Sequence, residues 1–150
     1  MSLENKVKAT GELEVLLYGA DGKIKERRVV KNLVVDAGEV IIAQAMANES
    51  PTLPSHMAIG TSNTAVDGTQ TALQGTELDR NALTSTTRST SSVTYQASWA
   101  AGDGTGTIEE AGLFDAASAG NMFARALTGT IVKGASDALT INWTVTFSGV

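Results

Sequence analysis

Cysteine is absent from this sequence, which excludes disulfide bonds and thiolate metal sites. His56 is the only histidine, so neither a two-histidine metal site nor a pair of catalytic imidazoles can form. The sequence also lacks a Gly-x-Ser-x-Gly elbow, a phosphate-binding Gly-x-x-x-x-Gly-Lys-Ser/Thr loop and a His-Glu-x-x-His helix. Few routes to catalysis remain, and we expect His56 to be a loop or interface residue.

Charge is also scarce. Charged residues form 18% of the chain, with 11 Lys and Arg against 16 Asp and Glu, and the formal net charge is −5. A nucleic-acid partner is not expected, because phosphate binding needs clustered Lys and Arg. The one basic concentration, residues 23–28, is balanced by Glu12, Glu14 and Glu26.

Long hydrophobic runs are missing as well. No segment reaches the roughly 20 apolar residues of a membrane helix, so no membrane partner is expected. The first residues lack the apolar stretch of a secretory signal. We expect residues 1–6 to form a flexible N-terminal arm.

What the sequence does contain is alternation of apolar and polar residues, the mark of a strand with one buried face. It runs without a break through residues 139–147 and recurs at 93–99. We expect Leu139, Ile141, Trp143, Val145 and Phe147 to face the core. About eight such segments, separated by turn signals, predict a mainly β protein: 8–18, 24–35, 57–60, 93–99, 107–114, 122–127, 131–133 and 139–147.

These strands predict a single-domain β-sandwich, jelly-roll-like, over residues 7–150, with one short helix. Residues 84–92 are low in complexity and fit either a solvated strand or a loop. Residues 72–80 fit a helical turn, and the broken alternation of 108–114 indicates a bulge near Gly112.

The first two strands form a hairpin in this prediction. The Asp-Gly pair at 21–22 is typical of a type I′ turn, which needs positive φ at both residues. A two-residue loop places Glu12 opposite Lys31 and Glu14 diagonal to Arg27, so opposite charges help to hold the register.

Residues 36–48 predict the helix. Asp36 can cap it, and Glu39, three residues later, completes a capping box. Beyond the first turn only Gln44 and Asn48 are polar. A helix this apolar must be covered over most of its girth, by the sheet or by another subunit.

Glu109, Glu110 and Asp115 form the one carboxylate cluster that suggests a glycosidase or a calcium site. Adjacent residues on a strand point to opposite faces, so Glu109 and Glu110 cannot share a ligand unless a bulge turns them. We expect Glu110 instead to form a structural ion pair with Arg125 or Arg80.

Asp67 and Asp103 lie in Gly-rich loops but lack the spaced acids of calcium-binding loops. We therefore expect no catalytic residue, no metal site and no cofactor, and a hydrolase is the least favoured hypothesis.

Five segments together resemble a group of small structural proteins encoded by tailed bacteriophages, and their order covers about residues 30–147. Proteins of this group are tail-fibre-like, baseplate-associated or capsid-decorating. The chain shows no coiled-coil or repeat shaft and no separate receptor-binding tip, which favours a compact unit attached to a lattice. The segments are 32–38, 57–64, 71–80, 108–115 and 122–125.

The resemblance implies a non-enzymatic virion protein, made in the bacterial host cytoplasm. Our leading hypothesis is a capsid decoration (cement) protein that binds the assembled shell and clamps neighbouring major capsid subunits. The alternative is a tail-fibre or baseplate module that stacks host glycans on aromatic rings. The candidates for stacking are Tyr18, Tyr95, Trp99 and Trp143, but both tryptophans lie on apolar strand faces, which favours core packing.

The sequence also predicts a homo-oligomer, a dimer or trimer. The helix is apolar around nearly its whole girth, whereas one sheet face covers about half of a helix. Residues 1–6 and 84–92 are polar and are expected to order on contact with partners, the first of them on a neighbouring shell subunit.

Overall fold

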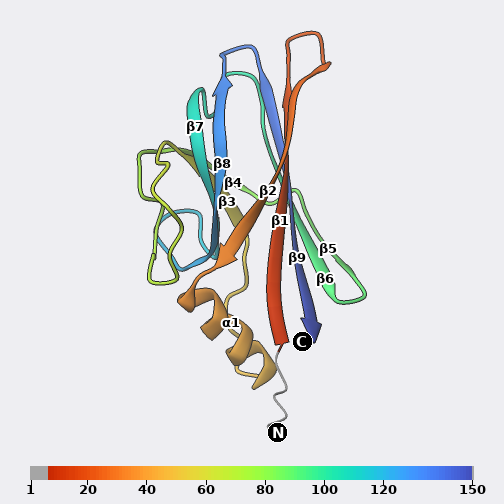
Figure 1. Ribbon diagram of the computed structural model, residues 1–150, viewed down its shortest axis with the longest axis vertical. Coiled ribbons are helices and arrows are strands. Elements are labelled where there is room, and N and C mark those ends of the chain that lie inside the picture. The colour runs from red at the N-terminus through yellow and green to blue at the C-terminus, as the bar shows by residue number, and fades with distance from the viewer. Residues whose placement is uncertain (1–6, 150) are drawn as a thin grey trace, which may run out of the picture.

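The computed structural model describes residues 7–149, so the arm predicted for residues 1–6 lies outside the described residues. The described part is mainly β, as predicted, with one helix (Figure 1). Its elements are β1 (Val7–Tyr18), β2 (Ile24–Val34), α1 (Asp36–Met46), β3 (His56–Gly60), β4 (Glu77–Ala82), β5 (Ser85–Ser89), β6 (Ser92–Trp99), β7 (Gly106–Phe114), β8 (Met122–Lys133) and β9 (Ala138–Gly149).

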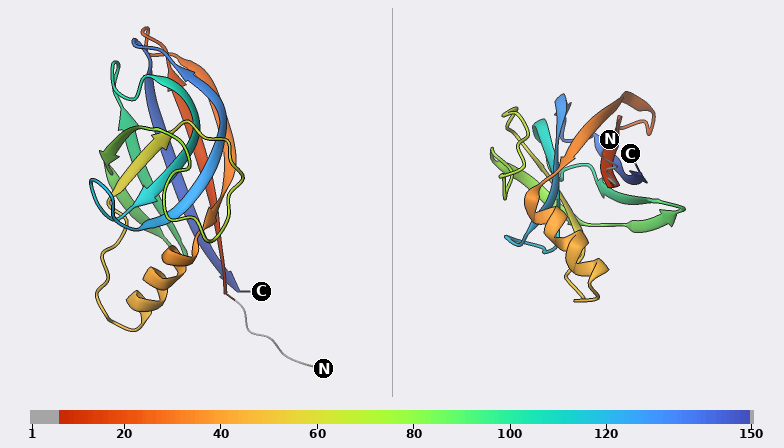
Figure 2. Two further views of the ribbon diagram at one scale, coloured as in Figure 1. Left: turned by 90° about the vertical axis from the view of Figure 1, so that its left-hand side faces the viewer. Right: turned by 60° about the horizontal axis from the view of Figure 1, so that its bottom comes forward.

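All nine strands belong to one antiparallel sheet in the order β4-β3-β7-β8-β2-β1-β9-β6-β5. The sheet curls, so that its two halves face each other (Figure 2). Its edge strands, β4 and β5, follow one another in the chain, and between them Thr84 N donates to Gln96 O at 2.7 Å. One curled sheet is not two separate sheets, so the predicted sandwich and jelly-roll topology is not confirmed.

The core fills the inside of the curl, and the alternating residues of both halves meet there. Leu139, Ile141, Trp143 and Val145 are buried as predicted, and Phe147 is half-buried at the end of β9. Tyr95 lies opposite Trp143 on β6, within the same core. The long alternating strands therefore build the inner face of the curl.

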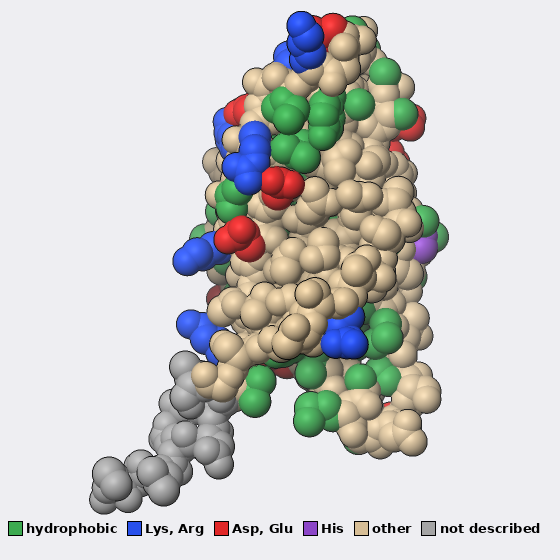
Figure 3. All heavy atoms as spheres, turned by 90° about the vertical axis from the view of Figure 1, so that its right-hand side faces the viewer, with side chains coloured by type: hydrophobic (Ala, Val, Ile, Leu, Met, Phe, Trp, Pro, Cys, Tyr) green, Lys and Arg blue, Asp and Glu red, His purple; other side chains and the backbone are tan. Residues whose placement is uncertain are grey.

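The outer face of β6 and β9 is a ladder of uncharged polar pairs. Ser92 bonds Thr146 at 2.8 Å and Thr94 bonds Thr144 at 2.9 Å. The Gln96 amide donates to Asn142 at 2.8 Å. Cross-strand pairs of this kind stabilise a sheet by a few tenths of a kcal/mol each. In Figure 3 the middle of this face is mainly tan, and most charged side chains lie along its left margin and at the top.

The β1–β2 register is the predicted one, with Glu12 opposite Lys31 and Arg27 paired to Glu14 at 2.7 Å. The predicted type I′ turn is wrong. Of the two turn residues only Gly22 has positive φ, 77°, while Asp21 uses its side chain to accept the Lys23 amide at 3.0 Å. One left-handed residue suffices because the connection between the strands is five residues long.

The predicted capping box is also wrong, and α1 ends two residues earlier than expected. Val35 occupies the N-cap position without a side-chain hydrogen bond. The loop ahead of β4 provides the acceptor instead, because Asp36 N donates to Gly68 O at 2.8 Å. A distant backbone carbonyl therefore takes the place of the capping side chain.

Three further local predictions change in the structure. Residues 77–82 form strand β4, so the helical turn predicted at 72–80 is wrong, and within 84–92 the strand alternative holds, as β5. The segments 122–127 and 131–133 join in one strand, β8. The bulge expected near Gly112 occurs between Ile108 and Glu110, with a second irregularity beyond Leu113.

We predict that Trp143→Ala lowers the free energy of unfolding by about 3–5 kcal/mol, because Trp143 is fully buried and the deletion leaves a cavity. Urea denaturation followed by circular dichroism measures the change. Thr144→Ala, on the outer face of the same strand, is the control and should cost less than about 1 kcal/mol. Equal costs would contradict this assignment of faces.

Candidate functional site

Glu110 and Arg125 form a fully buried ion pair between β7 and β8. Arg125 Nε and Nη2 each lie 2.8 Å from Glu110 Oε2. The sequence offered Arg80 as the other partner, but Arg80 pairs with Glu77 at 2.7 Å and lies 3.7 Å from the ring centre of Phe114. The predicted structural ion pair is present, with Arg125.

The loop of residues 61–76 closes over this ion pair, on the outside of the sheet. The amides of Ser62, Gln74 and Gly75 donate to the Glu110 carboxylate at 3.2, 3.0 and 2.9 Å. Arg125 Nη1 donates to Thr64 O at 2.8 Å. Both charges are satisfied and sealed from solvent, so this pair is a structural element and cannot reach a substrate.

The other two carboxylates of the predicted cluster lie apart from Glu110. Glu109 is at the bulge and accepts the Thr130 hydroxyl at 2.7 Å. Asp115 closes the β7–β8 connection by accepting Asn121 N at 2.7 Å. The structure thus does not assemble Glu109, Glu110 and Asp115 into one site.

Asp67 and Asp103 both lie in turns. Asp67 accepts the amide of Thr69 at 2.8 Å and its hydroxyl at 2.6 Å, and these bonds lower the pKa of Asp67. Asp103 lies in the β6–β7 turn, where its amide donates to Ala100 O at 3.0 Å. Within residues 7–149 no three His, Asp or Glu side chains lie close enough to hold a metal ion.

His56 opens β3, and its Nδ1 lies 2.8 Å from Ser55 Oγ. Its neighbours in the sheet are Ala82 on β4 and Phe114 on β7. Neither neighbour can orient the imidazole as the acid of a catalytic triad does. The adjacent hydroxyl and imidazole therefore form a local contact.

The aromatic residues considered for glycan stacking are mostly core residues. Trp99 and Trp143 are fully buried, and burial of Tyr95 raises the pKa of its phenol. Tyr18 is half-buried at the end of β1, next to the hairpin turn. Three of the four rings cannot meet a sugar without unfolding.

The helix presents three different faces. Gly38 and Ile41 are buried against the sheet, where Gly38 touches the backbone of Phe123. Val40 is 55% exposed, and Ala43 and Ala47, which follow on the same face, are also exposed. We call this apolar surface the outer α1 face. Its exposure agrees with the prediction that the sheet alone cannot cover the helix.

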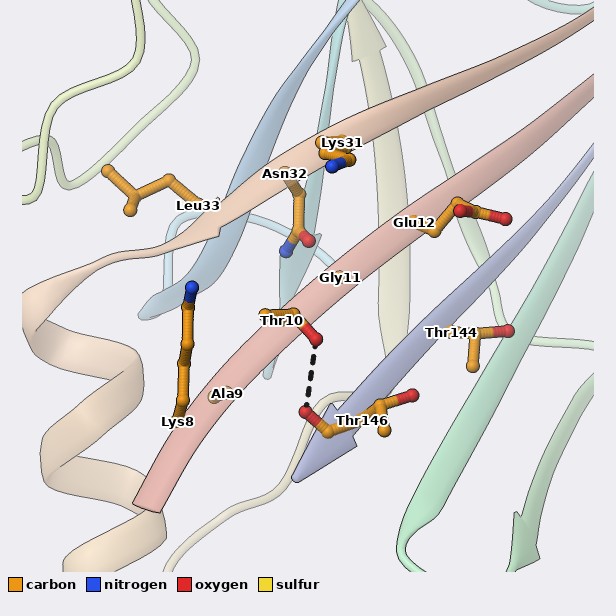
Figure 4. A pocket seen from close by; sticks show the side chains of 10 residues that line it. All are labelled: Lys8, Ala9, Thr10, Gly11, Glu12, Lys31, Asn32, Leu33, Thr144 and Thr146. Carbon is orange, nitrogen blue, oxygen red and sulfur yellow. Dashed lines mark hydrogen bonds between the residues drawn. The ribbon is translucent and has the colours of Figure 1, made fainter. Parts of the chain in front are cut away.

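The third face of the helix lines a groove of about 800 Å³ at the open end of the curled sheet. Ile42 and Met46 form one wall, with Glu39 above them, and Ala9 and Phe147 belong to the strands opposite. Met46 is 86% exposed. The groove is mostly apolar, and a second hollow of about 660 Å³ adjoins it, lined by residues of β1, β2 and β9 (Figure 4).

Both hollows exist because β1 and β2 part at this end. Their pairing stops at Gly11–Asn32, and from Asn32 to Val34 β2 pairs with β8 on its other edge. In the ladders of the described residues, Val7–Thr10 pair with β9 alone. The side of β1 that faces away from β9 is therefore open here, and we call Val7–Thr10 the open edge of β1.

Asn32 lies in the gap between the parted strands (Figure 4). It occupies space that only glycine at position 11 leaves, since a Cβ there would overlap its side-chain oxygen. Both polar atoms of its amide are buried and make no hydrogen bond within the described residues. Sequence analysis missed this feature, because Gly11 and Asn32 are unremarkable until their register is known.

Comparisons with protein-family models, curated proteins and solved structures give no match for this chain. No helix of the described residues is long and apolar enough to cross a membrane. The likeness to phage proteins therefore rests on the five sequence segments.

We predict that Arg125→Met lowers the free energy of unfolding by about 3–5 kcal/mol, because it leaves the Glu110 carboxylate buried without its counter-charge. The amides of Ser62, Gln74 and Gly75 should exchange with deuterium faster, since the loop loses its anchor. Arg27→Met, which breaks an exposed pair with Glu14, is the control and should cost about 1 kcal/mol or less. A mild effect of Arg125→Met would contradict the anchoring role.

A second set of charges lies at the β8–β9 turn. Asp137 accepts Gly134 N at 2.9 Å and Lys25 Nζ at 3.1 Å, and these bonds lower the pKa of Asp137. Lys133 is buried and donates to Ala100 O at 3.0 Å, and its burial lowers the pKa of the amine.

Asp137 should make the free energy of unfolding depend on pH in the acid range. Because its pKa is lower in the folded than in the unfolded chain, its contribution is complete above about pH 4 and is lost as the pH falls through the folded pKa. We predict that Asp137→Asn weakens the loss of unfolding free energy below about pH 4. Urea titrations across this range measure it, and identical acid slopes for both proteins would refute it.

Proposed function

We propose that this chain is a non-enzymatic structural protein of a tailed-bacteriophage virion, and specifically a capsid decoration protein. In this proposal it binds the assembled shell and clamps neighbouring major capsid subunits. The observation that carries the proposal is the outer α1 face, a contiguous apolar surface that the protein's own sheet leaves exposed.

An exposed apolar helix face fits a protein that works when attached to another surface. Val40 and, just after the helix, Leu53 are both more than half exposed. Burying such surface contributes about 25 cal/mol per Å² of apolar area, before the costs of association. Many copies on one shell would add avidity, so each contact can be small.

Four of the five segments that carry the resemblance meet at the buried ion pair. Glu110 and Arg125 come from two of them, and the amides and carbonyls that bind this pair come from 57–64 and 71–80. The fifth, residues 32–38, leads into α1 and touches Phe123 O through the amide of Val35. The five stretches that carry the resemblance are thus parts of one folded unit.

The test uses shells of the phage that encodes the protein, expanded and stripped of it. Purified protein should bind these shells and raise their rupture temperature. Val40→Glu should weaken binding about tenfold or more, because it places a charge in the buried contact. Val132→Glu, at a residue 62% exposed on β8, is the matched control and should bind normally.

Absence of binding to shells at every maturation stage would overturn the proposal. Labelling of whole particles with a gold-conjugated antibody is a second test. Label on heads supports the capsid decoration proposal. Label on tails would instead move the protein to the fibre or baseplate, and activity on a substrate would remove the non-enzymatic assignment.

A further inference from the structure

We propose that the open edge of β1, together with the groove beside it, joins two copies of this chain about a two-fold axis. The contact uses Val7–Thr10 on β1 and the groove-facing side of α1, and leaves the outer α1 face accessible. It goes beyond the proposed function, because the shell plays no part in it.

The first argument is the open strand edge. The backbone groups of Val7–Thr10 that point away from β9 have no strand partner in the described chain. Such an edge is a template for another strand, and proteins usually cover it. An identical edge is the simplest complement, because two copies related by a two-fold axis run antiparallel and complete each other.

The register of such a contact avoids like charges. An axis through Ala9 pairs Ala9 with Ala9 of the second copy and Lys8 with Thr10 of the second copy, because directly opposite residues of an antiparallel pair must lie on the same face. The antiparallel direction is the one that every neighbouring strand of this sheet uses. The two lysines then do not lie opposite one another.

The second argument is the composition of the groove. Val7, 79% exposed, and Met46, 86% exposed, both line it, so the apolar surface lies directly beside the open edge. Lys8 and Glu39 also line it and form no ion pair with each other. In a two-fold contact the Lys8 of one copy can meet the Glu39 of the second copy, twice over.

The third argument is Asn32. Its amide offers a donor and an acceptor within the gap, and both are buried without a partner in the described residues. An unsatisfied buried polar group costs about 1–3 kcal/mol. Both atoms are covered in the single copy, so the Asn32 side chain has to rotate toward the gap, where the backbone of the second copy's strand supplies a matching acceptor and donor and relieves this cost.

Sedimentation velocity of the full chain, from micromolar to millimolar concentration, tests the contact. We expect a dimer whose dissociation constant rises about tenfold or more in Val7→Glu and in Met46→Glu. Ile24→Glu, at the far end of the molecule and 55% exposed, is the control and should leave the dimer intact. All variants should have the same urea midpoint, which shows that their folds are equally stable. We expect this because the substituted positions are exposed.

A charge exchange tests the orientation. Lys8→Glu and Glu39→Lys should each weaken the dimer, and the double variant should restore it, because the paired charges are only exchanged. Hydrogen exchange should slow at amides among Val7–Thr10 above the dissociation constant.

A protein that stays monomeric at millimolar concentration overturns the inference, as does a dimer that Val7→Glu and Met46→Glu do not weaken. Failure to restore the dimer by the double variant overturns the two-fold orientation. Because no shell is present, a monomer that still binds shells would leave the proposed function intact. A dimer that binds no shell would support the two-fold contact and overturn the proposed function.

Discussion

The buried Glu110–Arg125 pair is the constraint on which half of this structure depends. Without it, the polar loop of residues 61–76 has little reason to lie on the sheet, because few apolar side chains hold it there: Leu73 packs in a small cluster with Val35, Ala58, Phe114 and Met122. The pair converts the loop into a cover through hydrogen bonds to its backbone. The same loop supplies Gly68 O to the first turn of α1, so the pair also helps to place the helix.

The residues that build the scaffold and the residues that form exposed apolar surfaces come from different parts of the sequence. The segments that resemble phage proteins converge on the pair and its loop, where they specify a scaffold. The surfaces that could recognise a partner lie elsewhere, on α1 and at the open end of the sheet, and outside most of these segments. The proposed place of attachment therefore has to be derived from the exposed apolar residues themselves.

Much of the fold could be predicted from the sequence, because it follows from local alternation. The faces of β9 and the β1–β2 register were predicted correctly, since a period of two and opposite charges fix them. The cap of α1 and the strand at 77–82 were not, because contacts distant in sequence decide them. The Glu110 partner was narrowed to two arginines, but the loop that seals the site was not foreseen. The gap at Asn32 was not foreseen either, because it depends on where the pairing of β1 with β2 ends.

The divergence of β2 from β1 links the ion pair and its loop to the open end of the sheet. β2 pairs with β1 on one edge as far as Asn32 and with β8 on its other edge from Asn32 to Val34, where Leu33 stands opposite Arg125. The strand that completes the ion-pair side of the sheet is thus the one missing from the side of Val7–Thr10. A curled sheet built on this pair exposes an edge at its other end, and the apolar wall of α1 lies beside that edge. The scaffold and the proposed association surface therefore both depend on the point at which β2 diverges from β1. An exposed edge of this kind favours a partner strand over water.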